Sequence, residues 1–182
     1  MPYFCKGCFS CFSNGEQTCP HYELMNPIVR AMECCDVIVM TSPVYSLDMS
    51  GQMKAFVDHL SYQYMPHRPN KHLFTKKAVI VATTAGAGTK RVVKSLKTDL
   101  NYWGISTVYS LTKAVRAADW TEISEKNKTK MLCAAKKIAH VLKRPAHINL
   151  KVKMLFGVMK LFLKKWNGKN QPRDAAYWEE NG

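Results

Sequence analysis

The amino-acid sequence predicts an α/β fold in which a parallel sheet is covered by helices on both faces. Residues 36–41 and 77–83 are continuous apolar runs rich in β-branched side chains, which is typical of strands buried on both faces. A third run covers 105–111, and segments with helical periodicity alternate with the three runs. Strands that alternate with helices pair in parallel, so we expect a ligand crevice beyond the carboxyl ends of the strands.

Capping and helix-breaking residues indicate where the helices begin and end. Asn26 precedes a proline and predicts a helix N-terminus, and Ser50 is placed to cap a second helix. Gly104 is expected to end the third helix, and Pro145 to stop the fourth. The expected helices cover residues 27–35, 53–60, 92–103, 121–143 and 149–166.

Composition indicates a globular protein. The chain has 182 residues, of which 47% are hydrophobic and 22% charged, which argues against a disordered chain. The longest nearly apolar run, 154–163, is interrupted by Lys160 and is shorter than the roughly 20 residues that span a bilayer. The first residues lack the charged start and apolar stretch of a signal peptide. We therefore expect a soluble, cytoplasmic protein.

The positive charge is concentrated in the last third of the chain. The formal net charge is +14, of which residues 1–125 contribute +3 and residues 126–182 contribute +11. No acidic residue lies between Glu125 and Asp174. Such a region suits a polyanion, an anionic membrane surface or an acidic protein, but it also describes ordinary solvated helix faces. No nucleic-acid-binding motif accompanies the charge, so no specific nucleic-acid partner is expected.

Within this basic region, one helical stripe is apolar, with lysines mostly to its sides. Its members are Leu150, Met154, Leu155, Val158, Leu161 and Phe162. The pattern predicts packing on the chain's own domain or on a partner subunit, and the alternative is a basic amphipathic helix that lies on a membrane surface.

Four of the seven cysteines lie within the first 19 residues. Cys5, Cys8 and Cys11 are spaced by three, and Cys19 follows eight residues later, directly before a proline. The spacing is similar to ferredoxin ligand patterns, although their last gap is shorter; zinc ligands and unliganded thiols remain alternatives. An odd cysteine count without a secretory signal argues against a disulfide framework. The other three cysteines, Cys34, Cys35 and Cys133, are expected to be small buried hydrophobes.

The loops after the first two strands form a second candidate site. Ser42-Pro43-Val44-Tyr45 offers hydroxyls, backbone amides and an aromatic ring, which suit a planar heteroaromatic ligand. Ala85-Gly86-Ala87-Gly88 offers backbone with almost no side chain, against which a flat ring can lie closely. Small residues at a strand end are also common turn chemistry.

Together these motifs resemble a known family. The cysteine pattern, the Ser-Pro-Val-Tyr loop and the segment Met49–Asp58 are similar to the flavodoxin-fold NAD(P)H-dependent FMN reductases, especially their iron–sulfur flavoprotein branch. The resemblance covers about residues 3–111 and is most specific from Ser42 to Asp58. It implies a flavodoxin-like three-layer sandwich with a parallel sheet, and an FMN-dependent oxidoreductase that transfers electrons.

The resemblance also implies site residues, cofactors and partners. The residues that would contact the isoalloxazine ring of FMN are Ser42, Pro43, Val44, Tyr45, Ser46, Thr84, Ala85, Gly86 and Gly88. The residues that would hold a [4Fe–4S] cluster are Cys5, Cys8, Cys11 and Cys19. The implied electron donor is NAD(P)H or a ferredoxin-like protein, and the implied assembly is a homo-oligomer. No catalytic side chain is assigned, since the flavin performs the redox chemistry.

One departure from the family concerns the start of the chain. Family members begin with a central strand and a glycine- and serine-rich loop for the FMN phosphate, and this chain begins after both. We therefore expect either a truncated product or a sheet whose neighbouring strands have closed over the gap. Without the phosphate loop, FMN affinity is expected to fall, because backbone amides and a helix N-terminus normally bind that phosphate.

The expected organisation is a flavodoxin-like domain over residues 1–145 and a basic helical extension over 146–182. The domain is N-terminally incomplete and includes the cysteine-rich segment 1–22. Two alternatives to a redox enzyme follow. One is a redox-inactive, truncated flavodoxin-like module, and the other is a basic peripheral protein that binds through residues 126–173.

Overall fold

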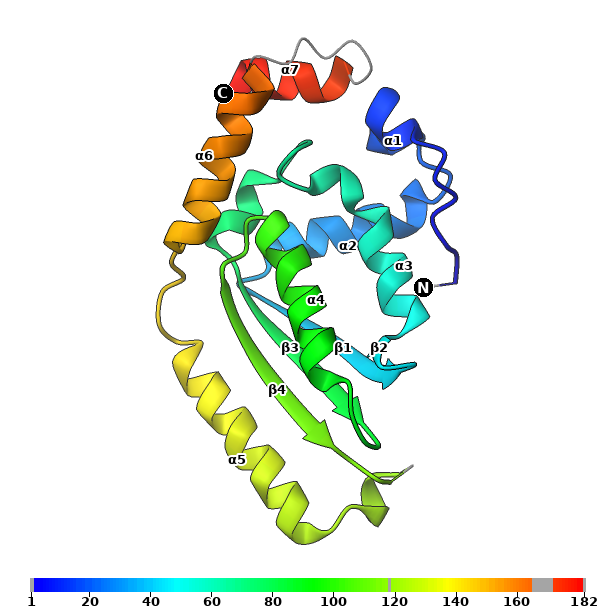
Figure 1. Ribbon diagram of the computed structural model, residues 1–182, viewed down its shortest axis with the longest axis vertical. Coiled ribbons are helices and arrows are strands. Elements are labelled where there is room, and N and C mark those ends of the chain that lie inside the picture. Colours follow the sequence, from blue (N-terminus) through cyan, green and yellow to red (C-terminus); the bar gives the residue numbers. More distant parts are fainter. Residues whose placement is uncertain (1, 118, 165–171, 182) are drawn as a thin grey trace.

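The computed structural model describes residues 2–117, 119–164 and 172–181, and its sheet has the strand order β2-β1-β3-β4 (Figure 1). Strands β1 (Val37–Tyr45), β3 (Lys77–Thr84) and β4 (Thr107–Ala114) pair in parallel. The short β2 (Asp48–Met49) turns back antiparallel on the end of β1. The expected parallel α/β sheet is therefore present, with one antiparallel addition.

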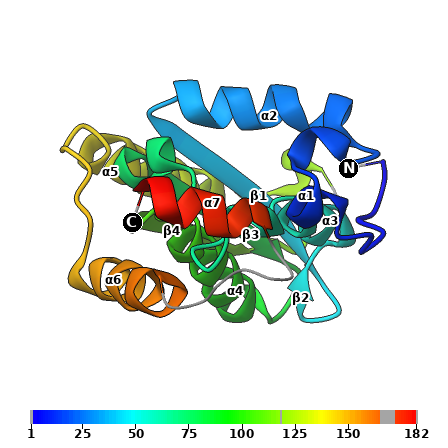
Figure 2. The ribbon, with the colours of Figure 1, turned by 90° about the horizontal axis from the view of Figure 1, so that it is seen from above.

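Helices lie on both sides of this sheet. The helices of the described residues are α1 (Ser10–Ser13), α2 (Tyr22–Cys34), α3 (Gly51–His59), α4 (Thr89–Tyr102), α5 (Glu125–Val141), α6 (Leu150–Lys164) and α7 (Pro172–Asn181). Val92, Leu96 and Leu100 of α4 are fully buried and form one core cluster with alternate residues of β1 and β3. Helix α5 lies along β4 on the side away from α4 (Figures 1 and 2).

Two of the predicted helix boundaries are confirmed by cap geometry. The Ser50 hydroxyl accepts a hydrogen bond from the Met53 backbone N–H at 3.3 Å, which starts α3. Gly104 follows the end of α4 with a φ of 94°, a left-handed conformation that side chains disfavour. A cap not foreseen lies at the end of α5, where the Lys77 ammonium donates to the carbonyls of Leu142 and Arg144.

The predicted start of the first helix, at residue 27, is wrong. Helix α2 begins at Tyr22, and Pro27 lies inside it rather than at its first position. A proline inside a helix removes one hydrogen bond, at a cost of about 3 kcal/mol. The helical turn that precedes Pro27 forms despite this cost because it buries Met25 in the core. The third strand is shifted as well, since Ile105 is buried in the connection that precedes β4.

The expectation that the family's first strand belongs at the centre of the sheet, between the strands of this chain, is also wrong. β1 pairs directly with β3, and β3 with β4, in continuous register over seven and eight residue pairs. In the flavodoxin-like strand order 2-1-3-4-5, the third, fourth and fifth strands of the fold are adjacent, as β1, β3 and β4 are in this chain. The first and second strands of that order lie on the other side of the third strand, which corresponds to the outer edge of β1. Within the described residues only β2 pairs on that side, at Val44 and Tyr45, and the neighbouring Val39 is 59% exposed.

The C-terminal helices contact the domain through aromatic rings. Phe156 of α6 lies 5.4 Å from Phe74 and 5.4 Å from Trp178, measured between ring centroids. Trp178 of α7 is buried in this contact and so anchors α7 against α6. Helix α7 was not predicted from the sequence. Leu150, Met154, Val158, Leu161 and Phe162 of the expected stripe are exposed and do not pack on the domain.

Candidate functional site

The four N-terminal cysteines line one cavity of about 330 Å³. The segment that carries them wraps past the C-terminal end of α3, which adds Asp58, His59 and Ser61 to the wall. Cys5 and Cys8 are exposed, Cys11 and Cys19 are half-buried, and none is in a disulfide. The structure therefore brings together the thiols that the sequence pattern groups.

The electrostatics of Cys11 show how closely the thiols approach one another. Burial, together with the neighbouring Cys19 and Cys5, raises the pKa of Cys11 to about 11. Without a cation Cys11 therefore stays a thiol, whereas bound iron would stabilise its thiolate. The Cys19 sulfur already accepts a hydrogen bond from the His21 backbone N–H at 3.5 Å, the type of contact that tunes a metal-bound thiolate.

The donor set fits a cluster better than a single ion. Within the described residues, no group of three or more cysteine, histidine, aspartate or glutamate side chains stands at the spacing that one metal ion requires. A cuboidal cluster is larger than one ion and accepts thiolates that are further apart around a common cavity. The four thiols line one cavity, which is compatible with a group of this size.

An ion pair that the sequence analysis missed holds the cysteine segment in place. Arg68 donates to the Cys11 carbonyl at 2.6 Å, lies 3.7 Å from Glu16 and pairs with Asp174 of α7. Asp174 is fully buried and also accepts from His67 at 2.7 Å. A signal was present in the sequence, because Asp174 is the first acidic residue after Glu125.

A pair of histidines connects the cysteine segment to α3. The His59 Nδ1 lies 2.6 Å from the Ala55 carbonyl and must donate to it, which leaves its Nε2 as an acceptor. His21 Nδ1 donates to that Nε2 at 2.7 Å, and Tyr3 stacks on the His21 ring. Burial, with the neighbouring His59 and Lys6, lowers the pKa of His21 and so favours its neutral form. The two histidines thus join the cysteine segment to the end of α3.

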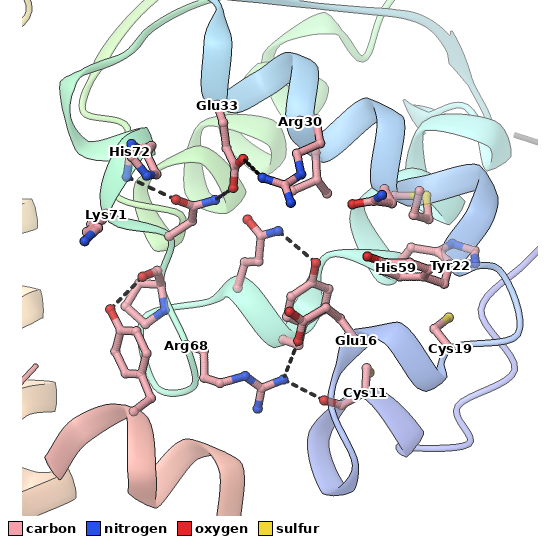
Figure 3. A pocket seen from close by; sticks show the side chains of 18 of the residues that line it. Cys11, Glu16, Cys19, Tyr22, Arg30, Glu33, His59, Arg68, Lys71 and His72 are labelled. Atoms are coloured by element: carbon pink, nitrogen blue, oxygen red, sulfur yellow. Dashed lines mark hydrogen bonds and ion pairs between the residues drawn. The ribbon is translucent and has the colours of Figure 1, made fainter. Parts of the chain in front are cut away.

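A second and larger cavity of about 520 Å³ adjoins the first (Figure 3). Cys11, Cys19 and His59 line both cavities, and α2 and α7 provide opposite walls of the larger one. Gln63 is 3% exposed and donates to the Tyr62 hydroxyl, while its Oε1 has no hydrogen-bond partner among the residues that the structure describes. A cavity of this size matches ordinary small-molecule sites.

The segment Ser42–Tyr45, expected to be a loop, is instead the last part of strand β1, which turns back in a tight hairpin onto β2. Tyr45 pairs with Asp48, so Ser46 and Leu47 form a two-residue turn, and both have positive φ, 50° and 64°. Ser42 is buried, and its hydroxyl donates to the Pro43 carbonyl and accepts from the Ser50 N–H. That hydroxyl shapes the loop from within, whereas Tyr45 is 62% exposed.

The second strand-end loop lies against the first. Gly88 has a φ of 100°, and a Cβ there would lie 2.5 Å from Val44 Cγ1. The Thr84 hydroxyl closes the loop by donating to the Ala87 carbonyl and accepting from the Gly86 N–H. A Cβ on Gly86 would meet no atom within 4 Å, so this part of the loop faces open space. Gly86 and Tyr45 are therefore open positions of the two strand-end segments.

The two candidate sites lie at opposite ends of α3. Ser50 caps the helix beside the hairpin, and His59 ends it at the cysteine cavity. Nine residues of helix correspond to about 13 Å. Neither cavity that the cysteines line includes a residue of the two strand-end loops. The remaining cysteines contribute to neither site, and Cys34 and Cys133 are exposed, which corrects the expectation of burial.

Comparison with known proteins identifies the family. Residues 3–119 match the NADPH-dependent FMN reductase family. The chain belongs to this family. The iron–sulfur flavoprotein of Archaeoglobus fulgidus is 27% identical over 187 residues, which cover 98% of this chain and 79% of that protein. The FMN-dependent NADH:quinone oxidoreductase of Shewanella sp. (strain ANA-3) is 30% identical over 95 residues, 47% of this chain and 48% of that protein.

A solved structure agrees with the fold. The apo form of an NADH:FMN oxidoreductase superimposes with a TM-score of 0.50 at 20% identity, over 71% of this chain and 63% of that chain. The chain thus spans about half of the curated quinone oxidoreductase and under two thirds of this FMN reductase. No helix in the described ranges combines the length and apolar character needed to cross a bilayer.

Proposed function

We propose that the chain is an FMN-dependent oxidoreductase of the iron–sulfur flavoprotein type. In this proposal Cys5, Cys8, Cys11 and Cys19 hold a [4Fe–4S] cluster, and the isoalloxazine ring lies on the two strand-end loops. The observation that carries the proposal is the arrangement of the four cysteines on one cavity wall. The similarity to the iron–sulfur flavoprotein, which extends over 98% of the chain, supports it.

The protein's own groups have defined tasks at the cysteine site. The four thiols bind as thiolates, the His21 N–H donates to the Cys19 sulfur, and the cation of Arg68 partly offsets their negative charge. The Arg68–Asp174 pair fixes the backbone around Cys11, so the ligand positions are set before a cluster binds. The hydrogen-bonded His21–His59 pair lines the same cavity beside the thiols.

At the flavin site, backbone positions matter more than side-chain chemistry. The ring-facing residues proposed are Ser42, Pro43, Val44, Tyr45, Ser46, Thr84, Ala85, Gly86 and Gly88. Ser42 and Thr84 act by holding the loops, while Gly86 and the exposed Tyr45 offer contact surface. A bound FMN would supply the chemistry of hydride acceptance and one-electron transfer at these loops.

The finer assignments complete the proposal. NAD(P)H or a ferredoxin-like protein supplies the electrons, and the protein acts as a homo-oligomer. A cytoplasmic location agrees with seven reduced thiols, because the cytosol keeps cysteines reduced.

FMN binding to the purified full chain tests the flavin part. Quenching of flavin fluorescence should show binding, and NADH or NADPH should then bleach the bound flavin. Gly86→Leu fills the open surface of the second loop and should weaken binding at least tenfold. Gly157→Leu is the matched control, because a Cβ at this glycine of α6 also meets no neighbouring atom. Equal FMN affinity for both variants would contradict the assigned ring position.

A further inference from the structure

Helix α6 has apolar side chains on two sides, and only one side packs on the protein. Val152 is fully buried, and the Phe156 ring lies between Phe74 and Trp178. On the opposite side, an outer stripe of five large apolar residues is exposed, with Figure 1 showing α6 at the periphery of the molecule. The outer stripe consists of Leu150 (72% exposed), Met154 (60%), Val158 (56%), Leu161 (70%) and Phe162 (73%).

The outer stripe is a continuous surface rather than a scatter of exposed residues. Steps of four, four, three and one residue keep the five side chains on adjacent rows of one helix side. Isolated exposed apolar residues are normal, whereas a contiguous patch marks an interaction surface.

The charged residues of α6 itself are all positive. Lys151 and Lys153 are exposed and Lys160 is half-buried, and within the described residues no acidic side chain pairs with them. The nearest acidic residues in the sequence are Glu125 and Asp174, so the whole helix and its flanks carry only cations.

This combination discriminates between possible occupants. A second copy of α6 would bring lysines against lysines, with no acidic residue on the helix to neutralise them. A nucleic acid would satisfy the lysines, but its phosphate backbone offers nothing to five exposed apolar side chains. An anionic bilayer surface suits both the apolar stripe and the lysines, because acyl chains accept the apolar side chains and lipid phosphates attract the lysines.

We propose that α6 docks the protein on an anionic lipid bilayer, with the outer stripe inserted at the headgroup–acyl boundary and the lysines at the lipid phosphates. The helix lies in the plane of the interface and does not cross the bilayer. None of the five stripe residues lines the cysteine cavities or the strand-end loops. The inference is therefore independent of the redox proposal.

Co-sedimentation of the full chain with vesicles tests this docking. The protein should sediment with vesicles of phosphatidylcholine and phosphatidylglycerol at low salt, and binding should weaken with added salt. Phosphatidylcholine alone should retain at least tenfold less protein. The double variant Leu161→Gln and Phe162→Gln should lose at least tenfold in binding to the anionic vesicles. Leu132→Gln is the matched control, since Leu132 is an exposed residue of α5 outside the stripe.

Two further measurements keep the proposal falsifiable. Far-ultraviolet circular dichroism should be unchanged in both variants, because the replaced side chains are exposed. A Phe162→Trp variant should show a blue-shifted tryptophan emission only with anionic vesicles. Absence of vesicle binding at low salt overturns the proposal. A dimer that the double variant dissociates, or binding to DNA that it abolishes, would assign the surface to another occupant and also overturns it.

Discussion

Replacing Asp174 with asparagine is expected to destabilise the protein and to release the cysteine segment. Asp174 is fully buried and pairs with Arg68, whose side chain is 13% exposed, and with His67. Removing one partner of a buried ion pair costs about 3–5 kcal/mol, because the other charge stays buried without compensation. Since Arg68 keeps a second acidic neighbour in Glu16 at 3.7 Å, we expect the lower end, about 3 kcal/mol.

This loss is large enough to measure by thermal unfolding. For a chain of this size, 1 kcal/mol corresponds to a shift of about 2–4 °C, so Tm should fall by roughly 6–12 °C. Because Arg68 also donates to the Cys11 carbonyl, alkylation of Cys11 should become faster in the same variant. Glu125→Gln, which breaks the exposed pair with Lys128, is the control and should cost less than about 1 kcal/mol.

A double variant separates the ion pair from other effects of the substitution. Arg68→Met with Asp174→Leu replaces the pair by apolar side chains and should recover much of the lost stability. If Asp174→Asn loses no more than the Glu125→Gln control and leaves Cys11 unreactive, α7 does not hold the cysteine segment.

The remaining predictions concern the strand-end loops and one buried carboxyl. Leu47→Gly should raise Tm by about 2–4 °C, because Leu47 has a φ of 64° and relief of that strain is worth about 1 kcal/mol; an unchanged or lower Tm would argue against the turn. Gly88→Ala should destabilise the protein by about 1–3 kcal/mol in chemical denaturation, since its φ is 100° and a Cβ would overlap Val44. Adding Val44→Ala should recover only part of that loss, and a neutral single variant would contradict the loop contact. Burial raises the pKa of Asp99, which accepts from the Tyr64 hydroxyl, so its contribution to stability is present below the unfolded pKa and is lost as pH rises through the folded pKa. Asp99→Asn should therefore gain stability relative to the wild type as pH rises from about 4; parallel pH profiles from denaturant titrations would refute this.

Local sequence signals predicted the core of the fold well. The runs around Val39 and Ile80 have too many β-branched and apolar residues for exposed loops, and they form paired strands. Ser50 and Gly104 act as caps because capping depends on one hydroxyl or one backbone angle. The predicted membership of the NADPH-dependent FMN reductase family is confirmed by the match over residues 3–119.

The failures of prediction involve tertiary contacts, which local sequence patterns do not reveal. Pro27 lies within α2 because buried Met25 offsets the missing hydrogen bond, which no local rule reveals. The Arg68–Asp174 pair joins residues more than one hundred positions apart, so spacing gives no hint of it. Cys133 was expected to be buried from the general behaviour of free cysteines, but α5 presents it to solvent.

The central claim, that the four N-terminal cysteines hold an iron–sulfur cluster, is tested most directly by metal analysis. The full chain is reconstituted anaerobically with iron and sulfide, and the bound iron and acid-labile sulfide are measured together with the visible spectrum. We predict about four iron and four sulfide per chain for the wild type and for Cys133→Ser, and a large loss of both for Cys19→Ser. An iron-free wild type after reconstitution, or equal iron in Cys19→Ser and Cys133→Ser, would contradict the claim.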